Sequence, residues 1–314
     1  MSFYLVTGGA GFIGSNIVEA LVERDEKVRV VDNFSTGKRG NLFPFMDRIE
    51  LLEADVLDLD AMQGACQGID YVLHQAALPS VPRSVADPMS STKVNIDGTV
   101  NVLWASKEAG VKRVVYASSS SVYGNQPVLP KKEDMPADPL SPYAISKYGG
   151  ELYTRVFHQI YGLSTVALRY FNVFGPRQDP NSQYAAVIPK FINAFMNGKS
   201  PVVFGDGEQS RDFTFVKNVV LANLLAARAE GASGQVLNIA CSQRITLNQL
   251  IKKLKRILNS HQEAIYTEPR PGDVRHSLAD ISKAEHLLNY KPTFAFQDGL
   301  EETVAWFRRA TSGQ

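Results

Sequence analysis

A glycine-rich turn between a predicted strand and a predicted helix constrains the fold of this chain most. Residues 5–14 read LVTGGAGFIG, with Gly8, Gly11 and Gly14 at every third position. The apolar run before this turn predicts a buried strand, and the sequence SNIVEALVER after it places apolar residues on one helical face. A helix entered through glycines offers unpaired backbone N–H groups to a pyrophosphate. A tight turn that needs glycine for positive φ is the alternative explanation.

The next predicted strand favours dinucleotide binding over a plain turn. Residues 27–34 read KVRVVDNF, and the strand ends in Asp32. A carboxylate at this distance from the glycines accepts hydrogen bonds from the adenosine ribose and repels a 2′-phosphate, which favours NAD over NADP. The nearby Lys38 and Arg39 weaken that preference. Asp55, which follows a third apolar stretch, either reaches the adenine edge or caps the next helix.

Strand-like and helix-like patterns continue to alternate along the first half of the chain. Further strands are predicted at 71–77, 113–119 and 164–173, and a helix at 95–110. Repeated βα units of this length predict an α/β fold, a doubly wound parallel (Rossmann) sheet with helices on both faces. Ligands of such sheets bind at the carboxyl ends of the strands.

The alternation loosens after residue 173, where loops rich in Gly, Pro and Asp appear. We expect an NAD-binding domain over 1–173 and a smaller C-terminal α/β domain over 174–314 that binds a nucleotide-sugar. The apolar run VLNIA at 236–240 is predicted to return to the sheet. The two domains are therefore expected to be interleaved, with a return segment near 213–241.

Composition and charge exclude several classes of function. The chain of 314 residues has 33 Lys plus Arg and 32 Asp plus Glu, so its net charge favours neither nucleic acid nor an anionic membrane as a partner. Its two cysteines, Cys66 and Cys241, have no metal-ligand spacing and predict neither a metal site nor a disulfide framework. We see no signal-peptide pattern and no long apolar span, and we expect a cytoplasmic protein.

A tyrosine and a lysine on one predicted helix are candidates for proton transfer. Tyr143 and Lys147 lie one helical turn apart in SPYAISKYGGELY, residues 141–153. An ammonium near a phenol lowers the phenol pKa from about 10, and the phenolate takes a proton from an alcohol as hydride leaves its carbon. Chance pairing on an amphipathic helix is the alternative. The serines of ASSSSVYG, residues 117–124, either hold a substrate oxygen in the same cleft or cap a turn.

Together these motifs resemble the extended short-chain dehydrogenase/reductases, in the branch of NAD-dependent nucleotide-sugar epimerases and dehydratases. The likeness extends through YFNVFGPRQ, SRDFTFV and PRPGDVRHSLADISKA. It implies that Tyr143 is the catalytic base and that Lys147 lowers the pKa of this tyrosine and holds the nicotinamide ribose. Ser119 best matches the catalytic hydroxyl residue, and Ser120 or Ser121 is able to share its task because the run leaves the register open.

The resemblance also implies the residues that bind the cofactor and the substrate. NAD is expected to contact Gly8, Gly11, Phe12, Ile13, Gly14, Asp32, Asn33, Asp55, Val56, Gln75, Tyr143 and Lys147. A UDP-sugar is expected to contact Ser119, Tyr143, Asn172, Val187, Arg211, Arg270, Asp273 and Ser277. The two arginines match residues that clamp the diphosphate, and Asp273 matches an acid on the uridine ribose. Exposed loop charges are the alternative for these C-terminal residues.

Within this branch, the residues after Ser119 favour epimerisation. Related dehydratases carry an Asp-Glu pair at this strand end and related decarboxylases carry a Glu, whereas Ser119–Tyr123 contains no carboxylate. The implied reaction oxidises C4 of a UDP-hexose to a transient ketone, with NAD as hydride acceptor and donor, and returns hydride to the opposite face. Ser277 matches a position beside the C2 substituent of the hexose. Its small side chain predicts UDP-N-acetylglucosamine and UDP-N-acetylgalactosamine, without excluding UDP-glucose and UDP-galactose.

The sequence leaves two alternative functions open, and the family resemblance suggests an oligomeric state. A UDP-glucuronate epimerase or decarboxylase needs a group of cations or hydroxyls for the C6 carboxylate, which the sequence does not identify. A non-catalytic NAD-binding sensor would not need the serine, tyrosine and lysine. By analogy with the family we expect a homodimer through the helices at 95–110 and 143–161, although Val100, Leu103 and Trp104 fit a core equally well.

Overall fold

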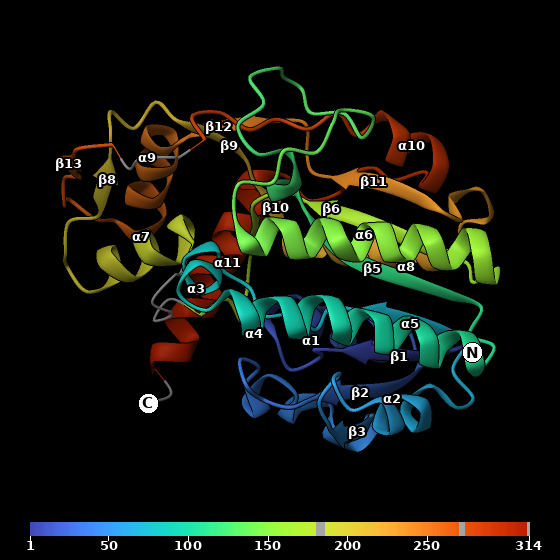
Figure 1. Cartoon of the computed structure of the whole chain (residues 1–314). Coiled ribbons are helices and arrows are strands. Elements are labelled where there is room, and N and C mark those ends of the chain that lie inside the picture. Colours follow the sequence, from blue (N-terminus) through green and yellow to red (C-terminus); the bar gives the residue numbers. More distant parts are fainter. Residues whose placement is uncertain (180–185, 270–273, 313–314) are drawn as a thin grey trace.

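The computed structural model of the chain describes residues 1–179, 186–269 and 274–312. Within them, a seven-stranded parallel sheet has the order β11-β6-β5-β4-β1-β2-β3 (Figure 1). Its strands are β1 (Phe3–Thr7), β2 (Lys27–Asp32), β3 (Glu50–Glu53), β4 (Tyr71–His74), β5 (Arg113–Ser119), β6 (Thr165–Tyr170) and β11 (Gln235–Ile239). The strand order reverses between β1 and β4, which is where such sheets bind ligands. The predicted α/β fold with a doubly wound parallel sheet is confirmed.

Helices cover both faces of this sheet because its strands are apolar on both faces. Successive residues of a strand point to opposite faces, so Val6 of β1 packs with α1 and α8, whereas Leu5 packs with α2, α5 and α6. These helices are α1 (Phe12–Val22), α2 (Leu59–Cys66), α5 (Gly98–Glu108), α6 (Pro142–Tyr161) and α8 (Val216–Arg228). No helix in the described ranges has both the length and the apolar character that crossing a membrane requires.

The ends of α6 follow from local sequence. The Ser141 side chain accepts a hydrogen bond from the Ala144 amide at 3.1 Å, and Pro142 occupies the first helical position. At the other end Gly162 adopts φ +69°, the left-handed conformation that glycine takes most easily. This long helix therefore begins directly before Tyr143, the residue predicted to be the catalytic base.

The helix expected at 95–110 is longer and less regular than its pattern predicts. A short α4 (Pro88–Thr92) continues through a π-helical turn, η3 (Lys93–Asp97), into α5. The short helix α3 (Val81–Ala86) packs beside α4, and the 3₁₀ turn η4 (Ser120–Tyr123) lies between β5 and α6 in the chain. A π-turn inside a helix often marks a functional site. The other 3₁₀ segments are η1 (Arg39–Asn41), η2 (Phe43–Arg48) and η5 (Glu230–Ala232).

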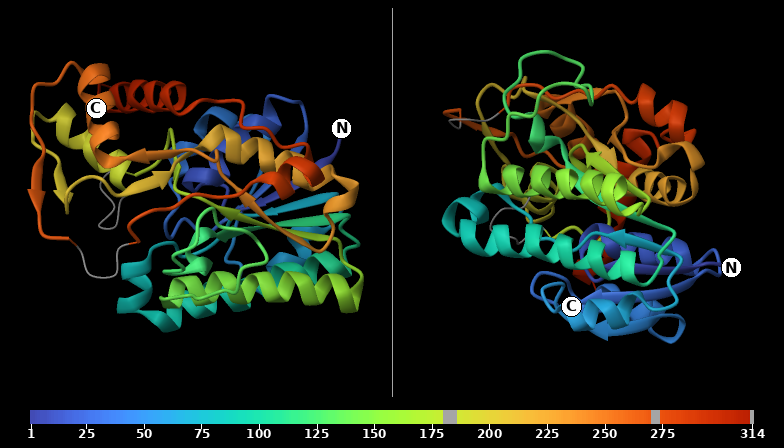
Figure 2. Two further views of the ribbon diagram at one scale, coloured as in Figure 1. Left: turned by 90° about the horizontal axis from the view of Figure 1, so that it is seen from above. Right: turned by 45° about the vertical axis from the view of Figure 1, so that its right-hand side comes forward.

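Except for α10 (Ser282–Leu288), the remaining elements lie beyond the carboxyl ends of the sheet strands, opposite the start of β1 (Figures 1 and 2). They form a second core that is rich in phenylalanine, including Phe174, Phe191 and Phe213. The helices of this second core are α7 (Val187–Met196), α9 (Leu247–Leu258) and α11 (Phe296–Ser312), whereas α10 packs beside β11 and α8 in the core of the sheet. The strands pair as β7 (Val173–Phe174) with β10 (Thr214–Phe215), β9 (Ser210–Asp212) with β12 (Arg244–Thr246), and β8 (Val202–Phe204) with β13 (Ile265–Thr267).

Candidate active site

The three glycines of the first turn have different structural tasks. Gly8 has φ +67°, and a Cβ on it would lie 2.7 Å from the Cα of Ala76. A Cβ on Gly14 would lie 2.1 Å from the carbonyl oxygen of Gly8. Gly11 caps α1, and a Cβ there would meet the same oxygen at 3.1 Å. Gly8 and Gly14 are therefore required by backbone packing, whereas Gly11 mainly keeps the space before the helix N-terminus clear.

A cavity of about 680 Å³ lies in front of this turn and reaches α6. It is lined by all of the residues that the resemblance assigns to NAD, namely Gly8, Gly11, Phe12, Ile13, Gly14, Asp32, Asn33, Asp55, Val56, Gln75, Tyr143 and Lys147. Two buried polar atoms of other lining residues, Arg177 Nε and Gln178 Oε1, have no hydrogen-bond partner in the described part of the chain. Such atoms favour a polar ligand. The volume, the open helix N-terminus and the acidic strand end fit NAD.

Asp32 is held rigidly where β2 ends. Its buried carboxylate accepts hydrogen bonds from the backbone amides of Ala10 at 2.9 Å and Phe34 at 2.8 Å. Burial raises the pKa of Asp32, and these two hydrogen bonds oppose that rise. The carboxylate is thereby oriented in the cavity wall before any ligand arrives.

The alternative role of Asp55 as a helix cap is not the one observed. Asp58 caps α2, since its side chain accepts a hydrogen bond from the Ala61 amide. Asp55 instead accepts hydrogen bonds from the Asn33 side chain at 2.7 Å and from the Leu57 amide at 2.9 Å. Its carboxylate therefore stands at the edge of the cavity together with Asn33.

The two cations beside Asp32 are both engaged by acids. Lys38 Nζ lies 3.0 Å from Asp179 Oδ2. Arg39 forms an ion pair with Glu53, and its guanidinium lies 4.0 Å from the centre of the Phe34 ring. These partners leave less positive charge for a 2′-phosphate, so the structure supports the preference for NAD that Asp32 suggested.

Asp32→Asn should weaken NAD binding about 10-fold, because it removes the charge that strengthens the hydrogen bonds to the ribose. The ratio of NADP to NAD affinity should rise, since the repulsion of a 2′-phosphate is also lost. Isothermal titration calorimetry of protein from which the cofactor has been removed measures the affinities for NAD and for NADP. Asp58→Asn, which exchanges one good helix cap for another outside the cavity, should change neither affinity. Equal effects of the two variants would contradict the role of Asp32.

Among the serines at the end of β5, Ser119 is the one that contacts Tyr143, the residue predicted to be the catalytic base. Ser119 hydrogen-bonds Tyr143, and its Oγ accepts hydrogen bonds from the Ser121 amide at 3.2 Å and the Ser121 hydroxyl at 2.9 Å. The Ser118 hydroxyl donates instead to Glu151. The Ser120 side chain makes no hydrogen bond with the described residues, so its expected share in catalysis stays a prediction.

Lys147 does not act on Tyr143 as the sequence predicted. Its Nζ donates a hydrogen bond to the Ala117 carbonyl at 2.9 Å and lies 5.2 Å from the centre of the Tyr116 ring. Burial lowers the pKa of Lys147 to about 8, opposed by the charge of Glu151. Burial raises the pKa of Tyr143, and the hydrogen bond from Ser119 lowers it. The predicted lowering of the Tyr143 pKa by Lys147 is wrong for this structure, because the ammonium turns to the end of β5.

A second cavity of about 310 Å³ adjoins the first at Ala186, which lines both. Three residues expected to bind the UDP-sugar line it, namely Asn172, Val187 and Arg211, together with Phe174, Phe191, Phe204 and Phe213. Its walls therefore combine aromatic surface with an amide and a guanidinium. Such a lining suits a polar ligand that carries an aromatic base.

The other expected substrate residues are only partly located. Ser277 lines neither cavity, but its hydroxyl accepts a hydrogen bond from Asn172 Nδ2 at 3.0 Å. The Asp212 amide also donates to this hydroxyl, at 3.3 Å. Arg270 and Asp273 lie outside the described residues, so their roles stay predictions.

A buried asparagine that the sequence did not single out, Asn95, connects the π-turn to α6. Asn95 Oδ1 accepts a hydrogen bond from the Leu78 amide at 2.7 Å, and Asn95 Nδ2 donates to Ser146 Oγ at 3.0 Å. Ser146 in turn donates to the Tyr143 carbonyl at 2.8 Å. The sequence offered no signal that singles out Asn95, because Asp97 and Asn101 are further polar residues of the same helical stretch. The contacts of Asn95 fix the loop after β4 against the first turn of α6.

Comparisons with known proteins agree with this site. The family described as the NAD dependent epimerase/dehydratase family matches residues 4–240. A putative UDP-glucose 4-epimerase from Methanocaldococcus jannaschii is 39% identical over 306 residues, which cover 97% of this chain and 98% of that protein. The structure of a UDP-N-acetylglucosamine 4-epimerase from Methanobrevibacter ruminantium, in complex with UDP-N-acetylmuramic acid, is similar with a TM-score of 0.94 and 47% identity, covering 98% of this chain and 99% of that one. A Thermus thermophilus UDP-glucose 4-epimerase in complex with NAD gives a TM-score of 0.89 and 36% identity, with coverage of 98% and 99%.

Proposed function

The chain belongs to the NAD-dependent epimerase/dehydratase family and is an NAD-dependent UDP-sugar 4-epimerase, and we propose that its substrates are UDP-N-acetylglucosamine and UDP-N-acetylgalactosamine. The observation that carries the proposal is the pair of adjoining cavities. The first fits NAD and contains Tyr143, and the second contains Asn172 and Arg211 beside aromatic side chains. The reacting sugar would therefore lie where the two cavities meet.

The residues at this junction suit proton transfer at the 4-hydroxyl of the sugar. NAD, when bound, supplies a hydride acceptor and donor for C4. Tyr143 in its phenolate form takes the proton of the 4-hydroxyl, and Ser119, which already hydrogen-bonds Tyr143, orients that hydroxyl. Tyr143 returns the proton after the 4-keto sugar has turned over. Asn172 and Arg211 hold the nucleotide while the sugar turns, and Lys147 is assigned to the nicotinamide ribose.

The carboxylates near β5 favour epimerisation over elimination of water. The turn η4 after Ser119 contains no acidic residue. Glu151 is occupied by Ser118 and Arg169, and Glu133 accepts a hydrogen bond from the Asn238 amide at 2.7 Å. Elimination needs a free acid and a free base beside the sugar, and these carboxylates are already bound.

Conversion of three UDP-sugars tests the proposed function. Purified protein is incubated separately with UDP-N-acetylglucosamine, UDP-glucose and UDP-glucuronate, and the anomeric and H4 signals are followed by NMR. We expect the N-acetylated sugar to be converted to its galacto epimer. Conversion of UDP-glucuronate alone would favour the glucuronate enzyme, and protein that retains NAD without converting any sugar would favour the sensor.

Ser277→Tyr should reduce conversion of UDP-N-acetylglucosamine by about 10-fold or more relative to UDP-glucose. The proposed reason is that a bulky side chain beside the C2 substituent crowds an N-acetyl group but spares a hydroxyl. The kcat/KM values for the two sugars, compared with those of the unmodified protein, measure the change in preference. Ser277→Ala is the control, because it removes the acceptor of the Asn172 hydrogen bond but stays small. Equal losses with both sugars in the tyrosine variant would refute this account of specificity.

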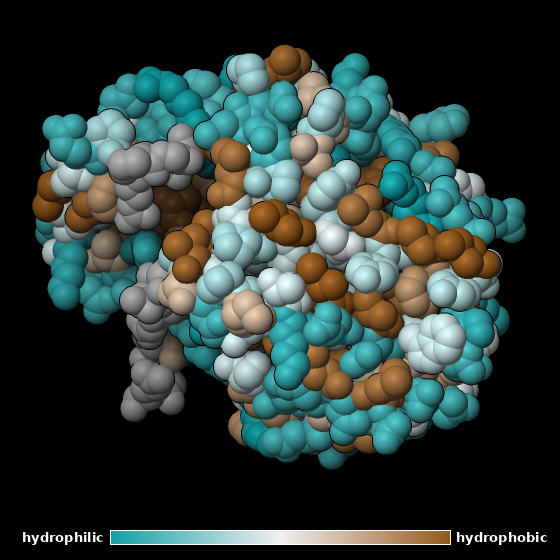
Figure 3. All heavy atoms as spheres, in the orientation of Figure 1, coloured by the Kyte–Doolittle hydropathy of each residue, from teal (hydrophilic) through white to brown (hydrophobic). Residues whose placement is uncertain are grey.

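We also propose a homodimer through α6. An apolar stripe along this helix is exposed, and it includes Ile145 at 55% and Ile160 at 70% (Figure 3). Of the α5 residues considered for this surface, Leu103 is buried in the core, whereas Trp104 is half-buried with its ring edge on Tyr161. Exposed apolar side chains along a surface helix fit a second copy of the same helix.

Ile160→Glu should convert the dimer to a monomer, since it places a charge in the apolar contact. Sedimentation equilibrium over a range of protein concentrations measures the change. Lys252→Glu, an exposed substitution on α9, should leave the assembly unchanged. A monomeric unmodified protein would contradict the proposed dimer.

A further inference from the structure

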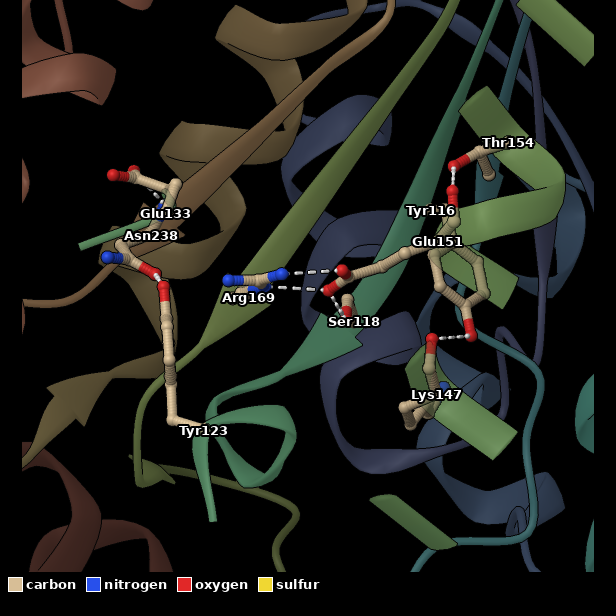
Figure 4. A network of polar contacts seen from close by, with 9 residues as sticks. All are labelled: Tyr116, Ser118, Tyr123, Glu133, Lys147, Glu151, Thr154, Arg169 and Asn238. Carbon is tan, nitrogen blue, oxygen red and sulfur yellow. Dashed lines mark hydrogen bonds and ion pairs between the residues drawn. The ribbon is translucent and has the colours of Figure 1, made fainter. Parts of the chain in front are cut away.

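A buried carboxylate lies one helical turn after Lys147, on the face of α6 that packs against the sheet. Glu151 forms a two-point ion pair with Arg169 of β6, with Oε1 2.9 Å from Nε and Oε2 2.8 Å from Nη2 (Figure 4). Both side chains are at most 5% exposed. Ser118 of β5 donates a hydrogen bond to the same carboxylate. One buried acid therefore connects α6, β5 and β6.

These contacts surround the segment that carries the catalytic serine. Ser118 directly precedes Ser119, and the carbonyl of Ala117 accepts the hydrogen bond of Lys147 Nζ. The helix thus holds the end of β5 at two adjacent residues, since Lys147 binds the Ala117 carbonyl and Glu151 binds the Ser118 hydroxyl. The distance between Ser119 on the strand and Tyr143 on the helix depends on this connection.

The charge of Glu151 also acts on Lys147. Burial of the ammonium lowers the pKa of Lys147 to about 8, and Glu151 opposes this lowering. The other ionisable groups packed around the ammonium add no negative charge: burial raises the pKa of Tyr116 far above 10 and lowers the pKa of His74 to about 3. Arg169 lies beyond the carboxylate, and the exposed Arg83 of α3 lines the same cavity.

A buried ion pair is weak evidence for stability, because desolvation of both charges offsets their attraction. We propose that Glu151 is a positioning residue of the epimerase: through Ser118 it holds Ser119 at the correct distance from α6, and through its charge it keeps Lys147 in the ammonium form. This inference rests on the proposed function, since it assigns Ser119 and Lys147 to that reaction. Arg169 pairs with the carboxylate and orients it from the side of β6.

The test compares Glu151→Gln with Ser118→Ala in NAD-loaded protein. Glu151→Gln should lower kcat by about 100-fold with little change in KM, because the catalytic groups are displaced without loss of substrate contacts. Lys147 should lose its proton at a lower pH, since the charge that favours the ammonium is gone. The alkaline limb of the kcat profile should therefore move to lower pH. Ser118→Ala removes only the connection to β5, so it should lower kcat without moving that limb.

Titration of Lys147 followed by ¹⁵N NMR gives a measure that needs no substrate. Lys147→Arg identifies the signal, and thermal unfolding and NAD content confirm that each variant is folded. If Glu151→Gln does not fold, Glu151→Gln with Arg169→Gln removes both buried charges and should still lower the pH at which Lys147 titrates. An unchanged Lys147 titration in the variant that folds would overturn the inference. Failure of the unmodified protein to convert any UDP-sugar would instead overturn the proposed function.

Discussion

Tyr143→Phe should lower the rate of epimerisation by about 10²- to 10⁴-fold, the usual contribution of a positioned general base. The substitution removes only the hydroxyl that Ser119 hydrogen-bonds. The start of α6 is set by the Ser141 cap and Pro142, so the helix should form unchanged. Steady-state conversion of UDP-N-acetylglucosamine measures the loss, and circular dichroism with NAD quantified after denaturation shows whether fold and cofactor are retained.

Tyr148→Phe is the matched control for this variant. Tyr148 is half-buried on the same helix and lines neither cavity, so its loss of a hydroxyl should leave the rate within about 2-fold. Below the pH at which Lys147 loses its proton, the rate of the unmodified protein should rise with pH, because burial raises the pKa of Tyr143 and a larger share of phenolate forms as the pH approaches it. Retention of most of the activity by Tyr143→Phe would remove the central residue of the proposed mechanism.

Gly14→Ala should destabilise the protein and release NAD. The new methyl group would lie 2.1 Å from the Gly8 oxygen and 2.8 Å from the Gly9 Cα, and neither backbone atom is able to rotate away. The turn must therefore shift, at a cost of about 1–3 kcal/mol in the free energy of unfolding. The same shift displaces the amides that start α1, which are assigned to the pyrophosphate. Denaturant unfolding and the NAD content after gel filtration measure the two effects.

Alanine substitutions at two other glycines, Gly64 and Gly11, distinguish a steric loss of stability from a loss of NAD binding. Gly64→Ala on α2 has no atom within 4 Å of the added methyl group and should stabilise the helix by about 1 kcal/mol. Gly11→Ala meets one oxygen at 3.1 Å, so it should cost little stability and still weaken NAD binding. A Gly14→Ala variant with the stability and NAD content of the unmodified protein would show that the turn does not carry the cofactor.

The sequence predicts those strands well in which an apolar run is buried on both faces of the sheet and ends in polar residues. The strand predicted at 113–119 is observed as β5, because an unbroken apolar run buried on both faces ends in serines. The parallel direction of the strands then follows from the βα alternation. The π-turn at 93–97 was not predictable from periodicity, since it depends on contacts of Asn95 with Leu78 and Ser146. The domain boundary near residue 173 stays a prediction.

In the candidate site, too, contacts within one segment could be predicted from the sequence, whereas contacts between different elements could not. The glycines and Asp32 belong to one short segment, and their meeting in one cavity could be predicted from its spacing. The direction of the Lys147 ammonium could not be predicted in this way, because the carbonyl that accepts its hydrogen bond belongs to β5, a different element. The pairing of Glu151 with Arg169 was missed for the same reason, since no local pattern joins residues of different elements.

The most direct test of the account uses UDP-N-acetylglucosamine that carries deuterium at C4. The labelled sugar is incubated with purified protein in ordinary water, and the product is analysed by NMR and mass spectrometry. The account predicts UDP-N-acetylgalactosamine that keeps the deuterium at C4, because hydride leaves and returns to the same carbon without exchange with solvent. Product with hydrogen from water at C4, or no product from protein that retains NAD, would contradict it.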